Sequence, residues 1–373
     1  MPQRTRRSLA IPGILQVLAS IALLLMLLAL PSPWHLPVDT ASPPLYRGVI
    51  VAQPHDGPNG IGSVLIEMLE GPAAGQQVAV EVDLGDEVTG AFVYNINDEV
   101  LVSEAQWEGG AIQRTVADRS RGGILIIALL IFAAAVALVG GWRGVRSLLS
   151  LVVVLIALLR FGIPAILSGA PPLLAAAGVA LAVTVVTSLV TEGPTRRATA
   201  AIIGIGASLI IACATSVALD GILSFTPIGG NMEILNLVPL LDRNVDLRGI
   251  GLAATLIGTL GIIDDVAITQ IAAVDELRTS DPQASGLQIG RRAHAIGQSH
   301  IGAVVNTLPL AYLAAALPLV VATLVAPGGI LVRFGTEQIA VELVRSLVGT
   351  LGVLAAAPLS TAAAILVGVG ELD

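Results

Sequence analysis

Long apolar stretches dominate this chain, and about eight of them reach the length of a membrane-spanning helix. The hydrocarbon core of a bilayer is about 30 Å thick, so a spanning helix needs roughly 20 apolar residues. The stretches that meet this requirement are Ile11–Leu30, Ile124–Gly141, Leu148–Leu167, Leu173–Val190, Ala198–Leu219, Gly249–Ala272, Ile301–Val325 and Ile339–Val367. We therefore expect an α-helical polytopic membrane protein.

The composition agrees with this fold class. Of the 373 residues, 55% are hydrophobic and only 12% are charged, whereas a soluble domain carries about 25% charged residues. The formal net charge of -8 argues against nucleic acid, which requires a basic surface. The lipid bilayer is the expected partner, and nucleic acid is not.

The arginines predict the orientation of the spans, because cytoplasmic loops carry an excess of basic residues. With the N-terminus inside, the short outer loops hold only Arg243, Arg248 and Arg333. The inner segments then hold Arg4, Arg6, Arg7, Arg143, Arg146, Arg196, Arg197, Arg278, Arg291 and Arg292. We expect both termini in the cytoplasm. The first stretch, within residues 1–30, is expected to be an uncleaved signal anchor; the alternative is a cleaved signal peptide.

Residues 45–118 differ from the rest of the chain, because they contain short β-like runs separated by turn residues. The runs are YRGVIVA, IGSVLIEML, QQVAVEVD, DEVLVSE and AIQRTVAD. About five short strands at this spacing predict a small β-barrel-like domain of the OB or SH3-like kind. The orientation places this domain outside the cytoplasm, and residues 123–370 form a seven-helix bundle.

Ionisable side chains inside a membrane are expensive and mark candidate functional sites. Asp264 and Asp265 lie about fifteen residues into the sixth stretch, roughly 23 Å from its outer end. Thr269 follows Asp265 by four residues, so the two share a face of the helix. Gly258 and Gly261, upstream, would permit close approach or movement of the helix.

The seventh stretch brings further polar groups to a similar depth. Asn306 and Thr307 lie near its inner end, and Pro309 removes a backbone hydrogen bond there. Carboxylate, amide and hydroxyl oxygens suit a cation or a proton. The pattern predicts an ion or substrate site between the sixth and seventh spans. The alternative is a structural cluster, in which the aspartates cap a neighbouring helix or pair with an arginine.

Other polar residues have simpler interpretations. Glu342 and Arg345 are three residues apart and are expected to pair, as is Glu192 with Arg196 or Arg197. Gly204 and Gly206 are interpreted as helix-packing residues rather than as a nucleotide motif, since no strand precedes them.

No pattern in the sequence points to a metal, a cofactor or a catalytic centre. The single cysteine is Cys213, and the histidines lack metal-ligand spacing. The HExxH and GxSxG motifs of hydrolases do not occur. We expect neither a cofactor nor an enzymatic activity.

Four stretches resemble the YibE/F-like family of bacterial multi-pass membrane proteins. They are Val139–Leu151, Asp246–Leu277, His300–Pro318 and Val341–Ala364. The resemblance implies an N-terminal anchor, a small outer β domain and a helical bundle in the bacterial plasma membrane. It also implies that the aspartate before Val266-Ala267 is the family's typical acidic residue, which corresponds to Asp265. Asp264 departs from the family's pattern. The family has no settled activity, so the resemblance implies no particular reaction.

Two functions remain open from the sequence. The first is a transporter or permease for a small ion or solute, with its site between the sixth and seventh spans. The second is a non-transporting scaffold whose outer β domain binds a protein or a cell-wall component.

Overall fold

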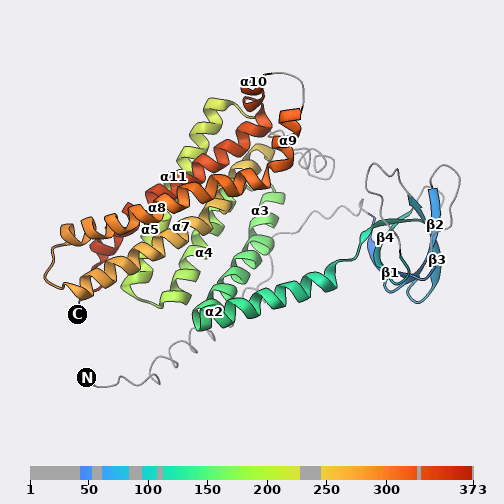
Figure 1. Ribbon diagram of the computed structural model, residues 1–373, viewed down its shortest axis with the longest axis horizontal. Coiled ribbons are helices and arrows are strands. Elements are labelled where there is room, and N and C mark those ends of the chain that lie inside the picture. Colours follow the sequence, from blue (N-terminus) through green and yellow to red (C-terminus); the bar gives the residue numbers. More distant parts are fainter. Residues whose placement is uncertain are drawn as a thin grey trace. The chain divides into compact units, whose positions relative to one another are not determined.

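The computed structural model describes residues 43–52, 61–83, 95–106, 112–226, 245–325 and 329–371 (Figure 1). The chain divides into two compact units, and the boundary in the sequence falls between Gly141 and Trp142. Each unit has its own hydrophobic core. The predicted first span, Ile11–Leu30, lies outside the described residues.

The first unit contains five strands in its described part: β1 (Leu45–Ile50), β2 (Ile61–Met68), β3 (Gln77–Asp83), β4 (Glu99–Gln106) and β5 (Ile112–Arg119). The strand order is β1-β2-β3-β5-β4, and β4 also pairs with β1, so the pairings form a closed ring. All pairs are antiparallel except β3 with β5. Each predicted β-like run therefore forms a strand.

Alternation along these strands explains the core of the sheet, because successive side chains point to opposite faces. Val64, Ile66 and Met68 of β2 are buried, as are Val100 and Val102 of β4. The residues between them, such as Leu65 and Leu101, are more accessible. One face of each strand thus builds a common apolar interior.

Helix α2 (Gly122–Ala157) is interrupted at Gly141, where φ is 54° and ψ is -140°. Only glycine adopts this conformation readily, because a Cβ atom would clash with the backbone. The break separates two apolar segments, Gly122–Trp142 and Gly144–Leu167. The second segment includes a π-helical turn, η2 (Leu158–Gly162), and the short helix α3 (Ile163–Leu167).

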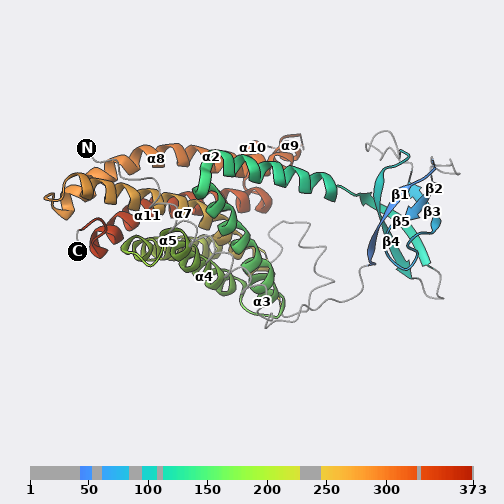
Figure 2. The same ribbon diagram turned by 90° about the horizontal axis from the view of Figure 1, so that it is seen from below.

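The remaining helices form the bundle. They are α4 (Pro172–Glu192), α5 (Arg196–Leu223), α7 (Leu247–Ser280), α8 (Gly286–Ala315), α9 (Leu317–Val325), α10 (Ile330–Phe334) and α11 (Glu337–Val367). Helix α7 packs against α4, α5, α8 and α11. It lies between α8 on one side and the α4–α5 pair on the other (Figure 2). It is the central helix of the bundle.

Six helices in the described ranges are long and apolar enough to cross a membrane. The number becomes seven if α8 and α9, which are bent by 67° relative to each other, count as one span. These correspond to the predicted spans from Ile124 onward.

The seventh span differs from its prediction, because α8 begins at Gly286 rather than near Ile301. Ser285 and Gln288 form a reciprocal capping box that starts the helix. The polar residues between Gln288 and Gln298 lowered the hydropathy of this stretch but do not interrupt its helix.

Candidate functional site

The two adjacent aspartates of α7 face different surroundings. Asp264 is half-buried, and its Oδ1 atom is inaccessible and lacks a hydrogen-bond partner among the described residues. Asp265 is exposed on the surface of the bundle. Successive residues of a helix are rotated by about 100°, so only one of the pair can point inward. Thr269 is also exposed, and its hydroxyl donates to the backbone carbonyl of Asp265 at 2.8 Å.

Helix α8 runs antiparallel to α7, with Tyr312 beside Gly258 and Gly297 beside Gln270. Interpolation between these contacts places Asn306 and Asp265 within roughly 4 Å of the same level along the helices. Their side chains do not converge on one interior site, however, because both are exposed.

The remaining candidates of α8 lie on its surface as well. Thr307 is exposed and bonds to the carbonyl of Ala303 at 2.8 Å. Pro309 lies inside α8 and is exposed.

The glycines proposed for helix movement have different environments. A Cβ added at Gly258 would lie 3.2 Å from the hydroxyl oxygen of Tyr312 in α8. A Cβ added at Gly261 would have no described atom within 4 Å. Gly258 therefore permits close packing with α8, whereas no packing constraint acts at Gly261.

A buried amide joins three helices of the bundle. Gln270 of α7 is 0% exposed, and its Oε1 accepts a hydrogen bond from Thr361 of α11 at 3.1 Å. A Cβ added at Gly297 of α8 would lie 2.6 Å from Gln270 Nε2. This Nε2 has no partner among the described residues. The amide thus fills a close junction of α7, α8 and α11.

Two buried hydroxyls of α4 lack a described hydrogen-bond partner, as do those of Ser216 and Ser360 elsewhere in the bundle. Thr184 and Ser188 are each 1% exposed, and their oxygens have no hydrogen-bond partner in the described part of the chain. Most helical hydroxyls bond back to a carbonyl of their own helix, as Thr191 and Thr259 do here. Buried polar groups are normally satisfied, so these two are available for a ligand or water.

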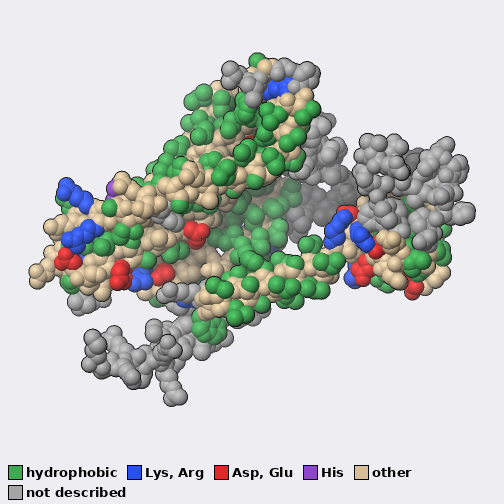
Figure 3. Space-filling model, viewed as in Figure 1, with side chains coloured by type: hydrophobic (Ala, Val, Ile, Leu, Met, Phe, Trp, Pro, Cys, Tyr) green, Lys and Arg blue, Asp and Glu red, His purple; other side chains and the backbone are tan. Residues whose placement is uncertain are grey.

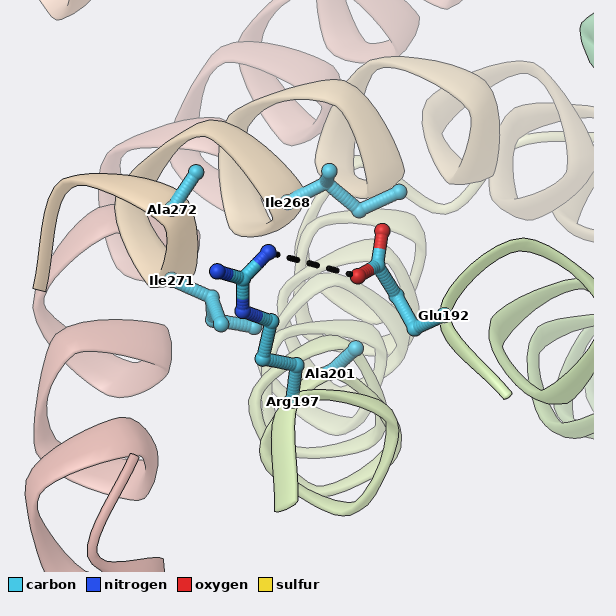
Figure 4. Close-up of a pocket in the computed structure, with 6 residues that line it drawn as sticks. All are labelled: Glu192, Arg197, Ala201, Ile268, Ile271 and Ala272. Atoms are coloured by element: carbon cyan, nitrogen blue, oxygen red, sulfur yellow. Dashed lines mark ion pairs between the residues drawn. The ribbon is translucent and has the colours of Figure 1, made fainter. Parts of the chain in front are cut away.

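A pocket opens at the end of the bundle where α4 ends and α5 begins. It is lined by Glu192, Arg197, Ala201, Ile268, Ile271 and Ala272. Arg197 and Glu192 face each other across it, beneath the apolar side chains of α7 (Figure 4). Their closest atoms are 3.8 Å apart, and Arg197 also pairs with Asp275.

Further charged contacts surround this end of the bundle. Arg278 pairs with Glu371 at 3.0 Å, and Arg196 donates to the carbonyl of Gly368 at 3.1 Å. At the opposite end, Arg248 pairs with Asp220 at 2.7 Å. The ends of the helices are therefore held by ion pairs, while apolar residues cover the sides.

Two predicted ion pairs are confirmed. Arg345 pairs with Glu342 at 2.6 Å, and Arg197 pairs with Glu192. The packing role of Gly204 is also confirmed, because a Cβ there would lie 2.8 Å from the Cα of Ser360 in α11.

The sequence did not single out Gln270, Ser188 or Asp275. Ser188 lies four residues before Glu192, and that spacing is the one signal that could have related it to a charged helix end. In the described ranges, no group of three or more His, Cys, Asp or Glu residues could hold a metal ion.

Comparison with known proteins gives one match. The family model described as YibE/F-like protein matches residues 128–368. No curated protein and no solved structure matches the chain. The matched region includes the described helices from α4 to α11. The resemblance found in the sequence is confirmed. Because the match covers more than half of the 373 residues, this protein belongs to the YibE/F-like family.

Proposed function

We propose that this protein is a multi-pass membrane transporter for a small ion or solute, with the carboxylates of α7 in its binding site. One observation carries the proposal. Asp264 lies on the central helix of an apolar bundle, and its Oδ1 atom is inaccessible and has no hydrogen-bond partner among the described residues. An ionisable group in such a place is costly and is typically retained for a function.

Interrupted helices support a transporter, because binding sites in transporters often lie where helices are broken. The α8–α9 pair bends by 67°, whereas α11 continues through Pro358. The candidates of the sequence, Asp265, Thr269, Asn306 and Thr307, would then form an outward-facing polar surface beside Asp264.

Embedding in the bacterial plasma membrane is part of the proposal. Apolar side chains cover the flanks of the bundle, and charged side chains gather toward its ends (Figure 3). The end that carries Arg196, Arg197 and Arg278 would be cytoplasmic by the positive-inside rule. Both termini would then lie inside, and the five-stranded sheet, as a small barrel of the OB or SH3-like kind, would lie outside.

Ion flux into proteoliposomes tests the proposal. Asp264→Asn should lower the flux of protons or Na⁺ at least tenfold, because the neutral amide cannot bind a cation as a carboxylate does. Asp265→Asn and Asn306→Ala test the exposed polar residues beside Asp264 in the same assay. Asp281→Asn is the matched control, since Asp281 pairs with Arg292 outside the pocket, and its flux should stay within twofold. Unchanged flux in the three test variants would refute a transport role for these residues.

A scaffold is the second candidate, and the separate core of the strand unit favours it. Such a unit could bind a protein or a cell-wall component while the bundle anchors it. Deletion of residues 46–118 would then abolish co-purification of a stoichiometric partner, and the intact protein would show no ion flux. A non-enzymatic role is common to both proposals.

A further inference from the structure

A polar stripe on α4 and a single carboxylate on α7 lie inward from the pocket. On α4, Glu192, Ser188 and Thr184 are spaced by four residues and therefore lie on one face. On α7, Asp264 lies four residues before Ile268, about 6 Å along the axis. Glu192 and Ile268 both line the pocket. Ser188 and Asp264 are thus each one helical turn inward from it.

Helices α4 and α7 run side by side, because they are parallel and in contact. Near their first residues, a Cβ at Gly249 would lie 2.9 Å from Cδ of Pro172. Near their last turns, both helices line the pocket. Ser188 and Asp264 therefore occupy the same level of the α4–α7 interface.

Three oxygens, two on the α4 stripe and one on Asp264, can still accept hydrogen bonds or bind a ligand. Thr184 Oγ1, Ser188 Oγ and Asp264 Oδ1 are all inaccessible and lack a hydrogen-bond partner among the described residues. Hydroxyl and carboxylate oxygens are ligands of hard cations. If these residues only supported the fold, three buried oxygens would stay without hydrogen bonds within about two helical turns. Buried polar groups in native proteins are normally satisfied, so a ligand or water is expected here.

Two carboxylates and one guanidinium meet at the pocket, and Arg146 bonds to the neighbouring carbonyl of Thr191. Arg197 is shared between Glu192 and Asp275, so one positive charge faces two negative charges. Asp264 adds a further carboxylate inward. Arg197 also lines the pocket, where its guanidinium faces Glu192 (Figure 4).

We propose that the polar stripe of α4 and Asp264 of α7 form a track that admits a small cation from the pocket to Asp264, and that Arg197 closes its mouth. The proposal rests on the proposed transport function, for which it names the substrate class and the access route. A cation would displace the guanidinium from Glu192, pass Ser188 and reach the carboxylate of Asp264.

Silver ion tests the track, because it is a small monovalent cation that reacts with thiols. The full-length protein with Cys213→Ser provides a background without cysteine. Ser188→Cys is compared with Ser208→Cys, since Ser208 is equally buried at 0% exposed but bonds back to Gly204 at 2.7 Å. Thiols that remain after timed exposure to silver are counted by maleimide labelling and intact mass after denaturation. Ala272→Cys, in the exposed lining of the pocket, is the positive control.

The track predicts that Ser188→Cys reacts at least tenfold faster than Ser208→Cys. Adding Arg197→Ala should accelerate the Ser188→Cys reaction at least threefold. Adding Arg292→Ala, which removes an ion pair at 3.1 Å outside the pocket, should leave it unchanged. If Ser188→Cys does not yield a monodisperse protein, Thr184→Cys, one turn further along the stripe, replaces it.

Equal rates for Ser188→Cys and Ser208→Cys would overturn the track. A faster Ser188→Cys that ignores Arg197→Ala would overturn the gating role of Arg197. Loss of flux in Asp264→Asn together with equal silver rates would leave the transport function standing without this route. A tenfold difference in silver rate without any ion flux would support the route and contradict the transport function.

Discussion

At the scale of single residues, small side chains decide how closely the helices of the bundle approach. Gly204 faces Ser360 in α11, and Gly297 faces Gln270 in α7. Between helices in a membrane, where no hydrophobic force drives association, packing and close approach carry much of the stability. These glycines therefore matter for stability more than the exposed Gly261.

Gly204→Ala should destabilise the bundle, while Gly206→Ala should not. The new methyl group at position 204 would lie 2.4 Å from Ser360 Oγ and 2.8 Å from its Cα, so α5 and α11 would have to separate. Such overpacking costs about 1–3 kcal/mol. At position 206 the nearest atom, in Leu181, is 3.9 Å away, an ordinary contact. Thermal unfolding in one detergent measures both, and equal Tm values would contradict close α5–α11 packing.

At the scale of elements, the joint within α2 depends on one backbone conformation. No described atom lies within 4 Å of a Cβ at Gly141, so the environment leaves room for a side chain. The constraint is the positive φ of 54°. The break at position 141 therefore depends on the freedom of glycine to adopt a positive φ.

Gly141→Ala should lower stability or remodel this joint, with a cost of about 1–3 kcal/mol for the strained backbone. Gly140→Ala is the matched control, because it has equal space and no positive φ. In the helix, alanine at position 140 is favoured over glycine by up to about 1 kcal/mol. Tm and hydrogen exchange around residues 138–146 distinguish the variants. A loss of stability in both would show that side-chain volume matters there.

At the scale of the whole molecule, two units with separate cores should respond differently to acid. In the strand unit, the hydrogen bond from Arg47 to Glu70, at 2.9 Å from Nε, lowers the pKa of that carboxyl. Burial acts to raise the pKa of Asp98, but hydrogen bonds from Asn95 and Arg119 outweigh it and lower this pKa.

These depressed values give the sign of the pH dependence. A carboxyl whose pKa is lower in the folded state contributes stability above its unfolded pKa and loses it as the pH falls through the folded value. The ordinary values are 4.5 for Glu70 and 3.8 for Asp98. Below this range, amide exchange in β1–β5, corrected for intrinsic rates, should accelerate before exchange in α5 or α11. Asp98→Asn should reduce the acid-dependent part, and an unchanged profile would argue against the Arg119 pair.

Most of the architecture was predictable because it depends on local patterns. Apolar length predicted the helices, alternation and turn residues predicted the five strands, and i, i+3 spacing predicted the Glu342–Arg345 pair. The start of α8 was missed, because a capping box acts through two polar residues that a hydropathy pattern does not weigh. Gln270 was missed because a lone amide carries no signal until its neighbours are known.

The pattern of neighbouring residues is enough to predict that α7 is an apolar helix with two adjacent carboxylates, since helix formation and hydropathy are local properties. It could not determine which carboxylate is inside, because a helix that is apolar on every side has no preferred face. The tertiary structure decided this through rotation. Packing against α4, α5, α8 and α11 turns Asp264 inward and leaves Asp265 on the surface. The same packing aligns Ser188 with Asp264, which no spacing along the chain relates.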